Sequence, residues 1–358
     1  MAISYCKKLS VTPSTRRKDI AMPQPPFELY KYLGKALPHL REQYPPGTGG
    51  TGPRAQWDGS LKGVQVIEDF GDQVVNFWKT IPDKPVQPHP NFKYPKIAQV
   101  HSKLPNPLKT PRDLQTCLSV LPLAACSAAL TALDADPADL KTTGPQAFDK
   151  AGYESDGGEE PEVVNQREMK TKGWKFQFNK SPMGSGEFLL MREGSDDVKL
   201  VVRTINSSAF TTADWEEYVV SGPYHYETRS KASWYWSRAW GASKRLGCQY
   251  YVLTDWQRWT FGYFNKDRTH GWTSPILHFN EQDPSIGHSL FFWARSAIGK
   301  ENGYKPQEKD VSGLPEIFPI NPSRRISHSG KSTPLGDLRK PKKANESDIE
   351  ESDAEGDV

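Results

Sequence analysis

A run of basic residues with one aromatic among them marks the segment between positions 231 and 245. Its members are Lys231, Trp234, Arg238, Lys244 and Arg245. Residues three or four apart share one face of a helix, so helical spacing would place these cations in a stripe around Trp234. Such a stripe binds phosphate groups while a base or a sugar stacks on the indole ring. The alternative is that the long basic side chains lie along a packed helix and keep their charged ends hydrated.

Other residue types that carry chemistry lack the spacing that the chemistry needs. The histidines of the same region, His225, His270, His278 and His288, have no metal-ligand spacing. The cysteines, Cys6, Cys117, Cys126 and Cys248, form no CxxC pair, which predicts free thiols in an intracellular compartment, nuclear or cytoplasmic. The glycines from Gly47 to Gly52 resemble a phosphate loop, but no Lys-Ser/Thr follows them, which favours a flexible linker. We therefore expect no cofactor.

The segment that carries the stripe predicts a long helix with strands before and after it. A helical pattern runs from 227 to 246 and ends at Gly247, a residue type common just after a helix. Its buried seam is predicted at Ala232, Tyr235, Ala239, Ala242 and Leu246. Apolar runs predict strands at 174–178, 186–192, 199–205, 248–254, 259–264 and 272–279. Further helices are predicted from the capping box Thr211–Asp214 and from Asp283-Pro284, with Asp283 as the N-cap.

Aromatic residues indicate where the core lies. Eight of the eleven tryptophans fall between Trp215 and Trp293. Large aromatics dominate core burial, so we expect the folded centre in this part of the chain. The 30 prolines, 28 glycines and mean hydropathy of -0.70 indicate that much of the remaining chain is not core. The net charge of +3 is too small to predict a polyanion partner, so only a local cluster of cations would do so.

These patterns divide the chain of 358 residues into five parts. Residues 1–59 are a mostly flexible region rich in basic residues, Pro and Gly, 60–134 carry accessory helices and an extended strap, and 135–162 are an acidic linker. Residues 163–300 form an α+β core domain, and 301–358 are a disordered tail, first basic and then acidic. In this tail, Arg339–Lys343 is either a nuclear localisation patch or a solvated run of charge.

Two helices are predicted in the accessory part. Ile67, Phe70, Val74 and Trp78 fall on one helical face, which predicts a helix over 60–81. A second helix begins near Thr110-Pro111, and the run from 114 to 133 that follows has no charged residue. A membrane span is one interpretation of such a run. Pro122 and the acidic flank after the run favour a buried helix that kinks at Pro122, so we expect no association with a membrane.

Within 174–300 the predicted elements follow the order β-β-β-α-β-β-β-α. An antiparallel three-strand meander, a helix and a strand that returns beside the meander resemble the restriction-endonuclease-like fold, which carries the PD-(D/E)xK nucleases. The chain is also similar to a group of uncharacterised fungal proteins that share a strand of the Leu253-Thr-Asp-Trp256 type. In those proteins an aromatic strand and a Trp-Thr-Ser-Pro segment, here 272–275, come next. The resemblance implies a three-layer core in which helices flank a mixed sheet.

The same resemblance implies where a catalytic site would lie. The family has an acidic residue on the second strand and Glu/Asp-x-Lys on the third, so that carboxylates hold Mg²⁺ and the Lys orients the attacking water. Arg203 and Ile205 occupy those third-strand positions here, which implies that the metal site is lost. Asp197-Val-Lys199 also matches the motif, with Glu187 as the first acid. The alternative is that Asp197 belongs to a plain hairpin turn, since such turns are rich in Asp.

We therefore expect a degenerate member of this fold that acts as a non-catalytic binding module, with nucleic acid or a protein as its partner. One alternative is an active, Mg²⁺-dependent nuclease that uses Glu187, Asp197 and Lys199. A second alternative is a purely structural or interaction protein whose aromatic residues all belong to the core.

Overall fold

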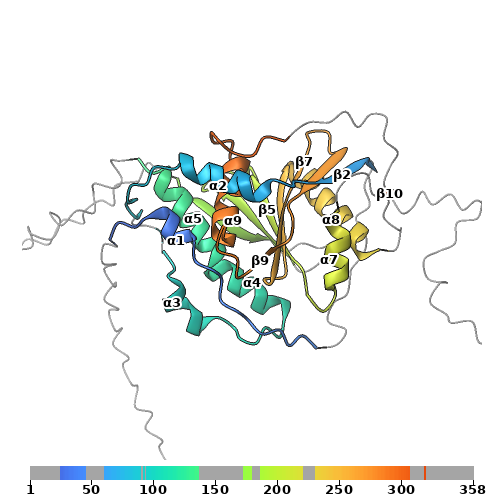
Figure 1. Ribbon diagram of the computed structural model, residues 1–358, viewed down its shortest axis with the longest axis horizontal. Coiled ribbons are helices and arrows are strands. Elements are labelled where there is room, and N and C mark those ends of the chain that lie inside the picture. Colours follow the sequence, from blue (N-terminus) through green and yellow to red (C-terminus); the bar gives the residue numbers. More distant parts are fainter. Residues whose placement is uncertain are drawn as a thin grey trace, which may run out of the picture.

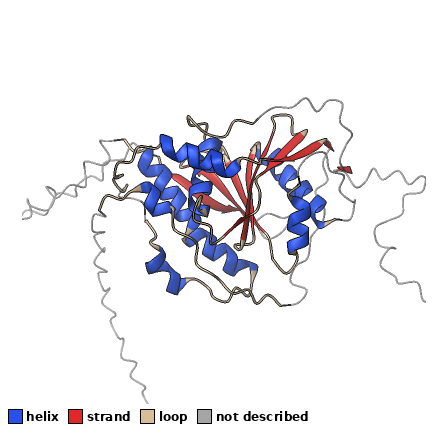
Figure 2. Cartoon of the chain, in the orientation of Figure 1, coloured by secondary structure: helices blue, strands red, loops and turns tan. Residues whose placement is uncertain are grey.

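An eight-stranded mixed sheet runs through the protein, with helices on both of its faces (Figure 1, Figure 2). The computed structural model describes residues 25–45, 60–89, 92, 94–136, 172–179, 186–220, 230–306 and 318–319. The strand order is β2-β8-β7-β6-β5-β4-β3, and β9 pairs with β7. The bounds are β2 Gly63–Val66, β3 Trp174–Asn179, β4 Glu187–Arg192, β5 Leu200–Thr204, β6 Tyr250–Thr254, β7 Arg258–Phe264, β8 His270–Thr273 and β9 Leu277–His278. A separate antiparallel pair joins β1 (Ser60–Leu61) to β10 (Phe318–Pro319).

The helices divide between the two faces of the sheet (Figure 1). One face is covered by α7 (Thr212–Tyr218) and α8 (Lys231–Leu246), and the other by α2 (Phe70–Thr80), α5 (Pro122–Leu133) and α9 (Ile286–Ala297). Shorter elements lie further out on the second side, namely α1 (Leu29–Leu33), α3 (Ile97–Val100), the 3-10 helix η1 (His101–Lys103) and α4 (Pro111–Val120). The α+β class and the mixed sheet flanked by helices agree with the prediction.

The centre of the sheet follows the predicted order of elements. β3, β4 and β5 form an antiparallel meander, α7 and α8 cross one face, and β6 returns parallel to β5. β7 then pairs antiparallel with β6. Successive side chains of a strand point to opposite faces. Val201 and Leu253 accordingly pack under α8, while Val202 and Val252 pack toward α9.

Aromatic side chains fill both layers, as the clustering of tryptophan predicted. The largest side chains that are almost completely buried include Trp215, Trp236, Trp240, Trp256, Trp259 and Trp293. The long helix ends at Gly247, whose φ of 67° is left-handed and lets the chain turn into β6. Most of the predicted linker 135–162, the segments Gly47–Gly52 and Arg339–Lys343, and His225 lie outside the described residues.

The prediction of one helix over 60–81 was wrong in its first half. Residues 63–66 form β2, which pairs parallel to β8 with Val64 opposite Gly271, and α2 begins only at Phe70. The periodic apolar face that suggested the helix belongs to α2, where Phe70, Val74, Phe77 and Trp78 are buried. Helices α2, α4 and α5 share one hydrophobic core with α9 and the sheet, so the parts 60–134 and 163–300 do not have separate cores.

The uncharged run from 114 to 133 is a buried helix pair that breaks at Pro122, as predicted. By length and apolar composition, Pro111–Leu133 would suffice to cross a membrane, but 72% of its most apolar stretch is buried inside the protein. Thr110 and Asp113 form the capping box that starts α4. Proline has no backbone N–H to continue the helix, and α5 starts anew at Pro122. Thr131 Oγ1 of α5 then accepts a hydrogen bond of 2.9 Å from the Trp174 backbone of β3.

Helix α9 holds the N-terminal α1 against the core. Its N-cap is Ser285 rather than the predicted Asp283, because the Ser285 hydroxyl accepts from the His288 N–H and also donates to the Leu33 carbonyl at 2.8 Å. A Cβ at Gly287 would lie 2.3 Å from the Leu33 oxygen, so only glycine allows this approach. His288 Nε2 lies 2.9 Å from the carbonyl oxygen of Tyr30, and the imidazole stacks on the aromatic ring of Tyr30.

His288 is expected to make the protein less stable in weak acid. Its Nδ1 is buried without a partner among the described residues, and burial lowers the pKa of its imidazole below 6.5. The folded state therefore binds fewer protons than the unfolded state, and stability falls as the pH drops below about 6.5 by at most about 1.4 kcal/mol per pH unit. Urea denaturation of the wild type and of His288→Gln across this range measures the effect.

The exposed His278 provides the matched control for this experiment. His278→Gln should keep the dependence on pH of the wild type, whereas His288→Gln should lose that part of it. Equal dependence on pH in the wild type and in His288→Gln would show that another group carries the effect.

Candidate functional site

A polar cluster interrupts the apolar layer between the sheet and α8. Glu187 is the first residue of β4 and is completely buried, and the sheet register places it directly opposite Arg203 of β5. Arg245 reaches the same point from the last turn of α8, and Asn179 from the end of β3. Strand alternation explains the placement, because Leu189, two residues after Glu187, also faces α8.

Both oxygens of the Glu187 carboxylate are bound by cationic side chains. Oε2 lies 3.0 Å from Arg203 Nη1, and Oε1 lies 2.5 Å from Arg245 Nη2. Asn179 Nδ2 donates to the same Oε1 at 3.2 Å. A carboxylate held by two guanidinium groups is neutralised without a metal ion, and both of its oxygens are already engaged.

Arg238 adds a third guanidinium group about two helical turns before Arg245. It is only 5% exposed, and its guanidinium carbon lies 4.0 Å from the centre of the Trp234 ring. Its Nε and Nη2 are buried and have no hydrogen-bond partner among the described residues. A buried donor without a partner costs free energy, so these two nitrogens mark a place where an acceptor would be stabilised.

The charges of the cluster do not balance. Glu187 supplies one carboxylate, whereas Arg203, Arg238 and Arg245 supply three guanidinium groups. Burial lowers the pKa of Arg203, and burial together with the charge of Arg203 lowers the pKa of Arg238 to about 10. A guanidinium with a pKa of about 10 keeps its charge at neutral pH. The cluster therefore carries excess positive charge and is suited to hold an anion.

An exposed strip of β3 borders this cluster. β3 is the last strand in the sheet order, and the register aligns Lys175 with Met191 and Gln177 with Leu189. Lys175 and Gln177 therefore project on the same face as Glu187, and both are exposed. We call Lys175, Gln177 and Asn179 the β3 strip. It leads from the cluster, at Asn179, to the exposed Lys175, which lies four residues or roughly 13 Å further along the strand.

The three residues proposed for a shifted nuclease site are not brought together. Asp197 and Lys199 form a partly exposed ion pair of 2.5 Å in the turn before β5. The Lys199 N–H donates to the Leu190 carbonyl at 2.9 Å, and Lys199 precedes Arg203, the partner of Glu187, by four residues, which corresponds to roughly 13 Å at the rise of a strand. Among the described residues, no group of three or more His, Cys, Asp or Glu side chains is placed to hold a metal ion.

The predicted stripe of α8 does not form one exposed face. Lys231 forms an ion pair of 3.2 Å with Asp214, and Lys244 is exposed with its amine 5.7 Å from the centre of the Trp240 ring. Trp234 is 6% exposed and lies under Arg238. The predicted seam is buried from Ala232 to Ala242. The other sides of α8 are buried as well over nearly its whole length. Helix α7 packs against α8, and Trp236 Nε1 donates to the Tyr218 carbonyl at 3.1 Å.

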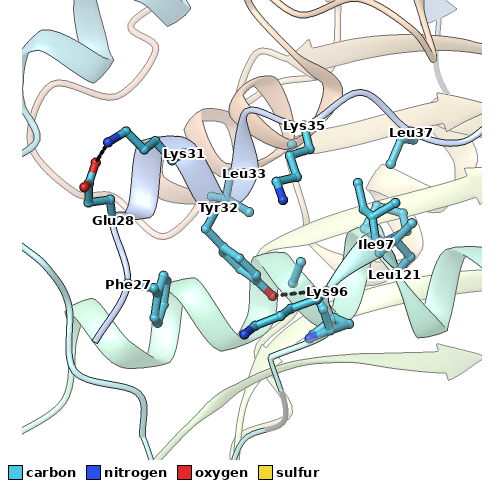
Figure 3. Close-up of a pocket in the computed structure, with 14 residues that line it drawn as sticks. Phe27, Glu28, Lys31, Tyr32, Leu33, Lys35, Leu37, Lys96, Ile97 and Leu121 are labelled. Carbon is cyan, nitrogen blue, oxygen red and sulfur yellow. Dashed lines mark hydrogen bonds and ion pairs between the residues drawn. The ribbon is translucent and has the colours of Figure 1, made fainter. Parts of the chain in front are cut away.

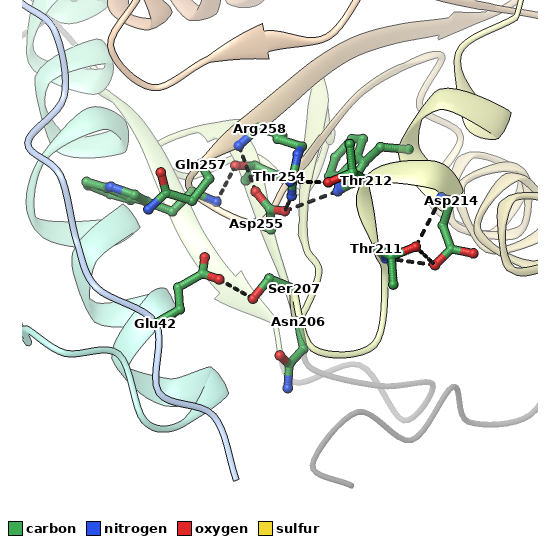
Figure 4. A network of polar contacts seen from close by, with 12 residues as sticks. Glu42, Asn206, Ser207, Thr211, Thr212, Asp214, Thr254, Asp255, Gln257 and Arg258 are labelled. Carbon is green, nitrogen blue, oxygen red and sulfur yellow. Dashed lines mark hydrogen bonds and ion pairs between the residues drawn. The ribbon is translucent and has the colours of Figure 1, made fainter. Parts of the chain in front are cut away.

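A second polar network, at the carboxyl ends of β5 and β6, is centred on the buried Asp255 (Figure 4). The Asp255 carboxylate accepts from the Arg258 N–H at 2.7 Å, from Arg258 Nη1 at 3.0 Å and from Trp215 Nε1 at 3.1 Å. Burial raises the pKa of Asp255 even though Arg258 is beside it. Both carboxylate oxygens are used, so Asp255 stabilises the turn from β6 to β7.

The N-terminal chain joins this network. Glu42 accepts a hydrogen bond from the Ser207 hydroxyl, 165 residues away in sequence, and burial raises the pKa of Glu42. Trp256 Nε1 donates to Pro38 O at 3.0 Å, which ties the same segment to the turn after β6. Sequence reasoning missed Glu42, since no local pattern relates it to Ser207. The Leu253–Trp256 segment was the only signal for this region.

Comparison with known proteins adds no relative for this chain. No family model matches it, and neither a curated protein nor a solved structure does. The site is therefore interpreted from its own geometry.

Replacing Glu187 by Gln is expected to lower the free energy of unfolding by about 3–5 kcal/mol, because Arg203 would remain buried without its counter-charge. The matched control is Asp197→Asn, which breaks an exposed pair and should cost less than about 1 kcal/mol. The double variant Glu187→Gln/Arg203→Met should recover part of the loss, since it removes the buried charge as well. Urea denaturation measures all three, and equal losses for Glu187→Gln and Asp197→Asn would contradict the role of the buried pair.

Proposed function

We propose that this chain is a non-catalytic binding module on a degenerate restriction-endonuclease-like core, and that the cluster under α8 with the β3 strip binds phosphate groups of nucleic acid. The order of elements supports the fold, because an antiparallel meander is followed by a helical crossover and a strand parallel to the last strand of the meander. The residue at the start of the second strand is acidic, as in the family, but Arg203 faces it from the third.

The single observation that carries the proposal is the surplus of guanidinium groups around Glu187. Two of them, from Arg203 and Arg245, bind the Glu187 carboxylate oxygens that a metal ion would need as ligands. The third, from Arg238, has two buried donor atoms that no described residue satisfies. Planar guanidinium donors match the geometry of phosphate oxygens, and phosphate is the anion that such groups recognise most often in nucleic acids.

The nuclease alternative makes a different demand on the chain. It requires Asp197 and Lys199 to act together with Glu187, although roughly four residues of strand separate them in the sheet, about 13 Å at the usual rise per residue. Arg203 and Arg245 would also have to leave the Glu187 carboxylate before it could bind Mg²⁺. The binding module needs neither rearrangement.

The purified protein is therefore expected not to cleave DNA or RNA when Mg²⁺ or Mn²⁺ is added. Gel analysis of labelled single-stranded and double-stranded substrates measures cleavage directly. Cleavage that is retained in Lys103→Gln but lost in both Asp197→Ala and Lys199→Ala, with the fold intact by circular dichroism, would establish the nuclease alternative instead.

A protein partner is the second candidate, and the edge of the sheet favours it. β3 is the terminal strand in the sheet order, so one of its edges has no strand beside it among the described residues. Phe178 on this strand is 43% exposed and stacks edge-on against Phe188. An extended segment of another protein could add to such an edge through main-chain hydrogen bonds, with its side chains against Phe178.

The nucleic-acid proposal predicts a loss of both affinity and salt dependence when the surface cations are removed. Lys175→Gln/Arg245→Gln should weaken binding of a fluorescent single-stranded oligonucleotide by the full-length protein. Each lost phosphate contact should flatten the slope of log K against log salt by about 0.7. Fluorescence anisotropy over a series of salt concentrations measures both quantities.

Lys79→Gln/Lys103→Gln is the matched control, because it removes the same charge from exposed positions on the other side of the sheet. It should change the slope less than Lys175→Gln/Arg245→Gln does. Equal slopes for the two double variants would contradict the proposed site and favour a protein partner.

A further inference from the structure

A pocket of about 280 Å³ opens on the side of the sheet away from α8, between α1, the chain around Lys96 and the break between α4 and α5 (Figure 3). Most of its wall is apolar, and Leu33, Ile97, Leu121 and Ala125 contribute to it. The volume lies near the lower end of the usual range of about 300–1,000 Å³ for ligand pockets. A small apolar body therefore fits it.

The walls of the pocket are held in place by contacts elsewhere in the protein. Leu33 is anchored by the hydrogen bond from Ser285 and by the close approach of Gly287, which itself lines the pocket. The Tyr32 hydroxyl donates to the Pro95 carbonyl at 3.1 Å and so joins α1 to the opposite rim. These contacts preserve the cavity without a ligand, so binding needs little rearrangement.

The rim of the pocket is positively charged. Lys31, Lys35 and Lys96 line it, and among the described residues the only lining carboxylate is Glu28, which forms an ion pair of 2.6 Å with Lys31. Lys35 and Lys96 are exposed, form no ion pair among the described residues, and extend from opposite sides of the opening (Figure 3). The Tyr32 hydroxyl already donates a hydrogen bond to the Pro95 carbonyl and Lys31 is paired with Glu28, so Lys35 and Lys96 are the cations that remain for a ligand among the described lining residues.

We propose that this pocket binds a small amphipathic molecule, an aliphatic chain that ends in a single anionic head group. The chain would lie against Leu33, Ile97, Leu121 and Ala125, and the head group would contact Lys35 and Lys96. Burial of the chain supplies most of the affinity, while the lysines select an anion over a neutral or cationic head. The site is independent of the nucleic-acid proposal, because it lies on the other face of the sheet and uses none of the same residues.

The first test uses carboxylates of increasing chain length with the full-length protein, kept below the concentrations at which they form micelles. Isothermal titration calorimetry with hexanoate, octanoate, decanoate and dodecanoate should show affinity rising about fourfold for each methylene group that enters the pocket. The rise should stop when the cavity of about 280 Å³ is full. Affinity that rises without limit, or no binding by any of the four, would overturn the proposal.

The second test changes the head group at constant chain length. Decanoate and decyl phosphate should both bind, and their relative affinity identifies a carboxylate or a phosphate as the preferred head. Decanol should bind more weakly, and decyltrimethylammonium should bind least because it faces Lys35 and Lys96. Equal affinity for the anion and the cation would contradict the role of the lysines.

Variants separate the pocket from the surrounding surface. Lys35→Gln/Lys96→Gln should weaken decanoate about tenfold while decanol changes less than twofold, and these exposed positions should tolerate the change. Lys79→Gln/Lys109→Gln, exposed lysines that do not line the pocket, is the control and should leave both ligands unchanged. Ala125→Phe should abolish binding of both by filling the cavity. Unchanged decanoate binding in Lys35→Gln/Lys96→Gln would refute the proposal even if Ala125→Phe fails to fold.

Discussion

Strands β5 and β6 run parallel at the centre of the sheet, and this pairing constrains the path of the whole chain. Parallel neighbours cannot be joined by a tight turn, so the chain between Thr204 and Tyr250 has to cross one face of the sheet. α7 and α8 make that crossing and close the face as an apolar layer in which Trp215, Trp236 and Trp240 are buried. Any charge that remains in such a layer requires a partner, because water is excluded from it.

The opposite face is built from segments that lie far apart in sequence. α2 and α5 come from the first 133 residues, and α9 from the region after β9, yet their side chains form one hydrophobic cluster. The N-terminal chain closes the carboxyl ends of β5 and β6 through Glu42 and through the bond from Trp256 to Pro38. The same attachment of α1 that completes this face also leaves the apolar pocket at Leu33, so the pocket follows from how the N-terminal chain is fastened.

The two faces differ in how they treat charge. On the α8 side, low dielectric surroundings strengthen the Glu187–Arg203 interaction and make the unpartnered donors of Arg238 costly. On the α9 side the charges lie at the rim, where Lys35 and Lys96 remain hydrated over an apolar cavity. A buried cluster suits recognition of a fixed phosphate geometry, whereas a charged rim over an apolar cavity suits an amphipathic molecule with one head group.

Local sequence patterns were sufficient for most of the elements. Apolar runs located β3 to β7, the capping boxes started α4 and α7, and Gly247 ended α8, because these signals depend on residues close to each other in sequence. The pairing of Glu187 with Arg203, Arg245 and Asn179 depends instead on strand register and on the angle at which α8 crosses the sheet. Burial of Trp234 and Arg238 likewise depends on tertiary packing around α8, not on their spacing. Strand β2 and the contact of Glu42 with Ser207 were decided by packing between distant segments, for which the local sequence contains no signal.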